Sequence, residues 1–102
     1  MILVHQRYFA KPGLRERVLE TRLEASRRLL ELGVPAGELW VPAREDAGMP
    51  DVIWNCTYPS MDERERIRTL QESDHAFHGI RTRQGSLVQQ FMREHYRRLD
   101  VM

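Results

Sequence analysis

The sequence has a single cysteine, no long apolar run and almost no net charge. Cys56 has no second cysteine with which to form an internal disulfide, which favours a reduced thiol and a cytoplasmic protein. No apolar stretch approaches the roughly 20 residues that a membrane helix needs. Residues 1–6 (Met-Ile-Leu-Val-His-Gln) lack a basic stretch and a cleavage site, so we expect no signal peptide.

The charge balance argues against a general affinity for polyanions. The formal net charge is +1, and the many arginines are interleaved with glutamate and aspartate. Binding to phosphates needs unbalanced positive charge on one surface, so we expect solvated helix faces and no nucleic-acid partner. Glycine-rich phosphate loops, nucleophile elbows and dinucleotide-binding fingerprints are also absent from the sequence.

The residues that are present fit one small globular domain over residues 1–102. Apolar residues make up 41% and charged residues 30%, the usual mixture for such a domain, and a chain of 102 residues supports only a thin core. The clearest element is a helix over residues 14–32, where apolar side chains recur every three or four positions. Gly33 ends it in the manner common at helix C-termini.

Turn and cap signals divide the chain into two halves, each a strand followed by a helix. The first strand covers residues 2–9 and ends at Pro12-Gly13, while the second and third cover residues 38–44 and 52–58. Pro42 has no N–H to donate, so the second strand should lie at a sheet edge or carry a bulge. Pro59 closes the third strand, and residues 60–63 (Ser-Met-Asp-Glu) match a capping box that starts a helix.

The C-terminal third is less regular. The helix that starts at Ser60 should run to about Glu72. We expect Ser73-Asp74 to cap a further helical segment that extends as far as Met92. The tail, residues 94–101, fits either a helix or a strand. We assign it to a strand, because a fourth strand is needed beside the open side of the first.

This order of elements predicts an α+β fold, the ferredoxin-like split βαβ. It contains a four-stranded antiparallel sheet with the helices on one face. The uncovered face should carry Val52, Trp54, Cys56 and Tyr58, if the third strand points its larger side chains away from the helices. A bare patch with these aromatic groups is unusual on a monomer. We therefore expect a homodimer that pairs two sheets face to face and encloses a cavity.

Two segments resemble the NIPSNAP family of the dimeric α/β-barrel superfamily, whose relatives include antibiotic-biosynthesis and haem-degrading monooxygenases. They are residues 8–13 (Tyr-Phe-Ala-Lys-Pro-Gly), which lead into a helix, and residues 58–64 (Tyr-Pro-Ser-Met-Asp-Glu-Arg), which follow a strand. The resemblance implies a dimeric α/β barrel with a cavity lined from the first and third strands. The lining residues would be Val4, Gln6, Tyr8, Trp54, Cys56 and Tyr58, with His75 and His78 near the mouth.

The candidate site residues follow from that cavity. The catalytic candidates are Tyr8, Trp54, Tyr58 and His75; the ligand-binding candidates are Gln6, Tyr8, Trp54, Cys56, Tyr58 and His78. Tyrosine hydroxyls can hydrogen-bond a ligand and tryptophan can stack on a ring, but the same aromatics could equally form dimer core. His75 and His78 supply two ligands on one helix, too few for a zinc or iron site, so we expect no metal.

Three interpretations of function remain open. The first is a NIPSNAP-like homodimer of unassigned activity, without a cofactor, that binds a small organic molecule. The second is a cofactor-independent monooxygenase that acts on an aromatic substrate. The third is a non-catalytic structural or assembly module with a filled interior. Haem degradation is disfavoured, because Gln6 stands where those relatives have asparagine and the second helix has no tryptophan.

Overall fold

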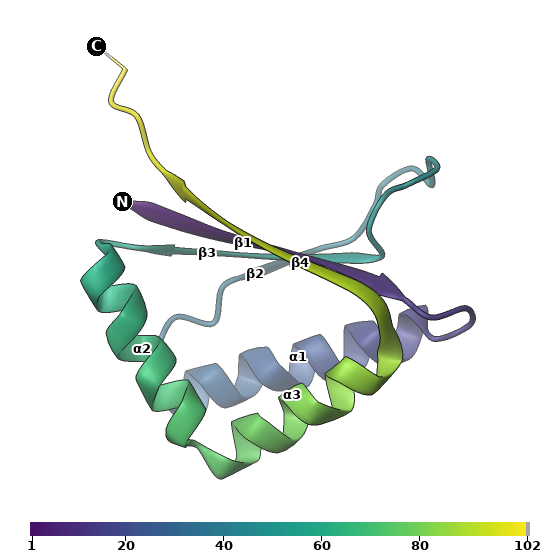
Figure 1. Cartoon of the computed structure of the whole chain (residues 1–102), viewed down its shortest axis with the longest axis horizontal. Helices are drawn as coiled ribbons and strands as arrows, with labels where there is room; N and C mark the ends of the chain where they lie inside the picture. The colour runs from purple at the N-terminus through teal and green to yellow at the C-terminus, as the bar shows by residue number, and fades with distance from the viewer. Residues whose placement is uncertain (102) are drawn as a thin grey trace.

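The computed structural model describes residues 1–101, which form one antiparallel sheet covered by helices on a single face (Figure 1). The sheet has four strands in the order β2-β3-β1-β4. In chain order the elements are β1 (Ile2–Ala10), α1 (Arg15–Glu31), β2 (Glu38–Trp40), β3 (Val52–Tyr58), α2 (Met61–Ser73), α3 (His75–Leu87) and β4 (Val88–Arg97). The predicted ferredoxin-like α+β fold, with its helices on one face, is confirmed. Within the described part of the chain, no helix is long and apolar enough to cross a bilayer.

The core lies between the sheet and the helices. Alternate residues of β1 and β3 are buried, among them Val4 and Val52, which have no exposed surface. Trp54 is 3% exposed and lies near Arg22 of α1, while Tyr58 lies near Arg64 of α2. The expectation that β3 turns its large side chains away from the helices is therefore wrong. The apolar stripes of the helices need apolar partners, and these side chains provide them.

The helix-free face is mixed in character. Strand pairing places Trp40 beside Ile53 and Leu3 beside Tyr96 on this face. Trp40 and Tyr96 remain 55% and 47% exposed. Polar side chains on the same face form hydrogen bonds with one another, as between His5 Nδ1 and Asn55 Oδ1 at 2.6 Å. The uncovered face thus carries exposed aromatic residues, but different ones from those predicted.

Two strands differ in length or position from the prediction. β2 ends at Trp40, well short of residue 44, because the Pro42 that follows cannot donate to a ladder. It does lie at the sheet edge, as predicted. β4 begins at Val88 directly after α3, so the helix stops before Met92 and the strand starts earlier than residue 94. Residues 88–92 have only a weak helical pattern, and their pairing with β1 outweighs it. As expected, β4 covers the open side of β1.

Both predicted helix caps are present. Ser60 Oγ accepts a hydrogen bond from the Glu63 amide at 3.2 Å, which starts α2. Within residues 1–101 the Glu63 carboxylate bonds Arg66 rather than returning to the Ser60 amide. Asp74 separates α2 from α3, and its Oδ2 accepts from the Phe77 amide at 2.8 Å. Its Oδ1 also accepts from Arg28 Nη2 at 2.6 Å, which ties α1 to the α2–α3 junction.

The Asp74 contacts make the stability of the protein depend on pH in the acid range. The hydrogen bonds from the Arg28 guanidinium, and then from the Phe77 amide, lower the pKa of Asp74 from 3.8 to about 2. A carboxyl with a lowered folded pKa stabilises the protein above its unfolded pKa, and this stabilisation is lost as pH falls through the folded pKa. Between about pH 4 and pH 2, the melting temperature of the native protein should fall more steeply than that of Asp74→Asn.

The control for this comparison is Asp46→Asn, in the exposed loop before β3. Thermal unfolding followed by circular dichroism across this pH range compares the three proteins. The Asp46→Asn curve should run parallel to that of the native protein. A parallel Asp74→Asn curve would contradict the role of this cap.

Candidate functional site

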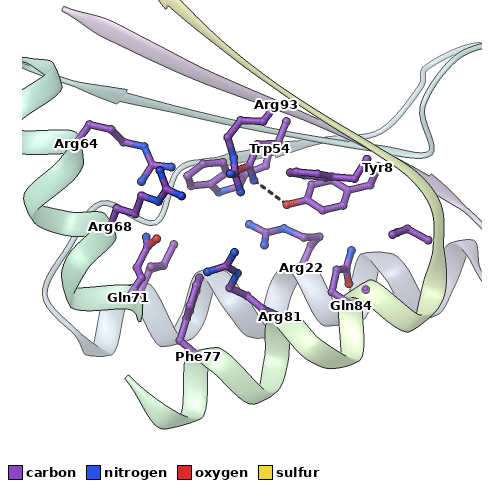
Figure 2. A pocket seen from close by; sticks show the side chains of 15 residues that line it. Tyr8, Arg22, Trp54, Arg64, Arg68, Gln71, Phe77, Arg81, Gln84 and Arg93 are labelled. Carbon is purple, nitrogen blue, oxygen red and sulfur yellow. Dashed lines mark hydrogen bonds between the residues drawn. The ribbon is translucent and has the colours of Figure 1, made fainter. Parts of the chain in front are cut away.

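A cavity of about 230 Å³ lies between the sheet and the helices (Figure 2). Every helix and three of the strands contribute to its wall, since residues from β1, β3, β4, α1, α2 and α3 all line it. Most of its lining residues fall into three chemical groups, and the others are Leu29, Gly85 and Val88. The aromatic residues are Tyr8, Trp54, Phe77 and Phe91; the amides are Gln6, Gln71 and Gln84; the arginines are Arg22, Arg64, Arg68, Arg81 and Arg93.

The strand side of the cavity is held by a short hydrogen-bonded chain. Arg93 Nε donates to Gln6 Oε1 at 2.8 Å, and Gln6 Nε2 donates to the Tyr8 hydroxyl at 2.7 Å. The arginine thereby fixes the orientation of the Gln6 amide. Because the Tyr8 oxygen already accepts a hydrogen bond, its own proton remains to be donated. The strand side therefore offers a hydroxyl donor next to an aromatic surface.

Trp54 is fixed by the segment that precedes β2. Its Nε1 donates to the Ala36 carbonyl at 2.8 Å. Gly37 comes so close that a Cβ built there would lie 2.4 Å from Trp54 Nε1. The indole therefore cannot move toward Gly37, and it forms a rigid part of the cavity wall.

Arginine side chains from four elements point toward the cavity (Figure 2). The Arg22 guanidinium carbon lies 5.1 Å from the centroid of the Tyr8 ring and 5.4 Å from that of Trp54. Arg64 is placed in the same way over Tyr58, at 5.4 Å. Burial, and next the charge of Arg64, lower the pKa of Arg93. The lining residues include no aspartate or glutamate.

The sequence predicted a cavity between two sheets on the helix-free face, whereas this cavity lies on the helix side of one sheet. Three of the predicted site residues, Gln6, Tyr8 and Trp54, line it. Cys56 and Tyr58 share the same face of β3 but are absent from the lining, and both are almost fully buried. Burial raises the pKa of the Cys56 thiol and of the Tyr58 phenol, so neither is poised to ionise near neutral pH.

His75 and His78 lie outside the cavity as well. Both are exposed on α3, and His78 borders a separate shallow depression together with Arg81. Within residues 1–101, no group of three or more histidine, cysteine, aspartate or glutamate side chains is arranged to hold a metal ion. The structure therefore brings the strand candidates together and leaves the helix candidates apart.

The sequence interpretation missed the arginines of the cavity, because it assigned arginine to solvated helix faces. A signal was present. Arg22 occupies a position of the buried stripe of α1, between Val18 and Ala25. Arg64 stands in the corresponding position of α2, before Ile67. A charged residue inside an apolar stripe marks a buried cation, which usually has a structural or functional partner.

Comparison with known proteins shows the fold. No protein-family model matches the chain, and no curated protein matches its sequence significantly. A NIPSNAP domain protein from Burkholderia xenovorans superposes with a TM-score of 0.76 at 12% identity, over 97% of this chain and 95% of that one. A NIPSNAP family protein from Agrobacterium tumefaciens gives 0.73 at 19%, over 99% and 88%. A structure described as an antibiotic biosynthesis monooxygenase gives 0.72 at 16%, over 98% and 100%. The chain is thus a NIPSNAP-like protein in its fold, similar along almost its whole length to solved NIPSNAP domain structures.

Proposed function

We propose that this NIPSNAP-like protein binds a small ring-bearing organic molecule in the cavity between the sheet and the helices. The observation that carries the proposal is the cavity itself, with aromatic walls, of which Trp54 is fixed, and inward-pointing polar groups. Known ligand pockets combine these features in volumes of about 300–1,000 Å³. A volume near 230 Å³ suits a compound with one ring. Trp54 and Phe77 supply surfaces for the ring, and Tyr8 supplies a hydrogen-bond donor.

Binding is better supported than catalysis. A cofactor-independent oxidation needs a base to take a proton from the substrate, and such bases titrate near neutral pH. Among residues 1–101, the cavity lining contains neither histidine nor a carboxylate. The interpretation as a monooxygenase acting on an aromatic substrate thus has cavity shape in its favour but no identified base. The interpretation as an assembly module requires a filled interior, which the cavity argues against.

The proposal includes a homodimer in the cytoplasm. Support for the dimer comes from the helix-free face, where Trp40 and Tyr96 are half exposed beside Leu3 and Ile53. A second copy packed on this face would remove these aromatic groups from water. The lone, buried Cys56 is a free thiol, which supports a reducing compartment.

Native mass spectrometry tests the bound molecule and the subunit number together. We expect protein purified from its own host to have the mass of a dimer plus one small molecule per subunit. A monomer without added mass at every concentration would contradict the proposal.

A pair of glycine variants locates the added mass. Gly85 lines the cavity on α3, and a Cβ there meets nothing within 4 Å. Gly79 lies on the same helix, is equally open and does not line the cavity. Both Gly85→Leu and Gly79→Leu replace a helical glycine with a better helix former. Gly85→Leu should lose the added mass, and Gly79→Leu should keep it.

A further inference from the structure

We propose that the ligand is an anion: a ring that carries a carboxylate or phosphate group, bound by Arg22 and Arg64. This inference rests on the proposed binding function and gives it a chemical class. The five arginines of the lining are the basis for it, and these two are the most deeply buried of them (Figure 2).

Arg22 and Arg64 are buried cations without an acidic partner among residues 1–101. Their exposed fractions are 6% and 4%, and neither forms an ion pair within residues 1–101. The Nε of each, and Nη1 of Arg64, are buried nitrogens with no hydrogen-bond partner. Buried charges in proteins are normally paired, because an isolated one loses its hydration without compensation. These guanidinium groups therefore need an acceptor, and none of residues 1–101 supplies one.

The aromatic rings beside these arginines do not fill that need. Arg22 lies over Tyr8 and Trp54, and Arg64 lies over Tyr58. A ring face attracts the positive charge, but it leaves the in-plane N–H groups without a strong acceptor. The ring contacts instead restrict where the guanidinium groups can lie. A fixed guanidinium matches the oxygens of a carboxylate or phosphate through two parallel hydrogen bonds.

The rest of the lining adds positive charge. Arg68 is paired with Glu72 at 3.1 Å, but Arg81 and Arg93 form no ion pair in the described part of the chain. No acidic side chain lines the cavity. A concave site with charge of one sign concentrates the field on whatever enters it. Both polar atoms of the Gln84 amide are also buried without a partner, so they remain available to a polar substituent.

Fluorescence of Trp54 provides the test. The chain has two tryptophans, and Trp40→Phe removes the exposed one, so that the remaining emission comes from the cavity wall. In this background three probes are titrated: benzoate, phenyl phosphate and benzamide. Benzamide has nearly the shape of benzoate without its charge. We expect benzoate or phenyl phosphate to bind ~10–100-fold more tightly than benzamide. This ratio of dissociation constants corresponds to the free energy of a hydrogen bond between charged groups. The probe that binds more tightly distinguishes a carboxylate ligand from a phosphate ligand.

Two pairs of variants assign the effect to the buried arginines. Arg22→Met and Arg64→Met keep much of the side-chain volume but remove the charge. Arg27→Met on α1 and Arg66→Met on α2 make the same change at exposed positions. In Arg22→Met and Arg64→Met, the ratio of the benzamide dissociation constant to that of the anion should fall ~10-fold or more, and in the controls it should not change. Thermal unfolding without ligand should give the first pair midpoints no lower than that of Arg27→Met, because an unpaired buried charge has been removed. Arg66→Met is left out of this comparison, because it also breaks the ion pair between Arg66 and Glu63.

The outcomes separate this inference from the proposed function. If benzamide binds as tightly as both anions, the anion preference is wrong and the cavity still binds a ring. If the anion preference survives in Arg22→Met and Arg64→Met, the assignment to these arginines is wrong. If none of the three probes changes Trp54 emission while the native dimer retains a ligand from its host, the inference fails and the proposed function stands. If the native dimer also retains nothing, both fail.

Discussion

Replacing Gly37 with alanine is expected to destabilise the protein by roughly 2–4 kcal/mol, through two separate effects. Gly37 has a φ of +74°, in the left-handed region that side chains rarely adopt. A Cβ there would also lie 2.4 Å from Trp54 Nε1 and 2.8 Å from the Asn55 carbonyl oxygen. The backbone oxygen belongs to the central part of the sheet and cannot move aside cheaply, so the indole or the segment before β2 must shift.

Gly33→Ala separates the two effects. Gly33 has the same φ of +74°, but a Cβ there meets nothing within 4 Å. This variant should therefore lose only about 1 kcal/mol, from backbone strain alone. Urea unfolding of both variants measures the difference, which reports the clash with Trp54. Equal losses for the two variants would show that the contact between Gly37 and the indole is not restrictive.

Gly37 also connects backbone geometry to the site. Displacing Trp54 would break its 2.8 Å hydrogen bond to the Ala36 carbonyl and alter the cavity wall. Emission from Trp54 in Gly37→Ala should therefore shift, while that of Gly33→Ala should not. Gly37, which does not line the cavity, thus determines the position of Trp54, which the sequence analysis had named as a candidate site residue.

Local signals in the sequence were sufficient for the elements of the fold. Ser60 and Asp74 begin helices because their side chains accept from amides three residues ahead, a relation visible in the sequence. The order of elements then gave the ferredoxin-like arrangement. Boundaries were less accurate where pairing between distant strands decided them, as at Val88, where partnership with β1 begins a strand immediately after a helix.

The orientation of the sheet was not predictable in the same way. Alternation in β3 separates Trp54 from Ile53, but it does not say which of the two faces the helices. Both faces of the sheet carry aromatic residues, so composition did not settle the question. The helices themselves decide it, since Arg22 and Leu29 on α1 line a cavity that Trp54 also lines. Gln6, Tyr8 and Trp54 were named because the resemblance implied a cavity lined from the first and third strands, and they line the cavity on the helix side of the sheet. The arginines were missed because they were assigned to solvated helix faces, although Arg22 and Arg64 occupy buried positions of α1 and α2.

Leu29→Ala is expected to cost about 2–3 kcal/mol, toward the lower end of the range for buried leucines. Leu29 is only 1% exposed, yet it borders the cavity and so already lacks neighbours on one side. The adjacent Leu30 is 65% exposed, and Leu30→Ala should change stability by less than about 0.5 kcal/mol. The lost methyl groups also enlarge the cavity at an apolar wall, which should improve binding of 2-naphthoate relative to benzoate. Urea unfolding and Trp54 titration measure the two effects separately. A stability loss without any gain for the larger ring would place the Leu29 side chain in the core but outside the space that the ligand occupies.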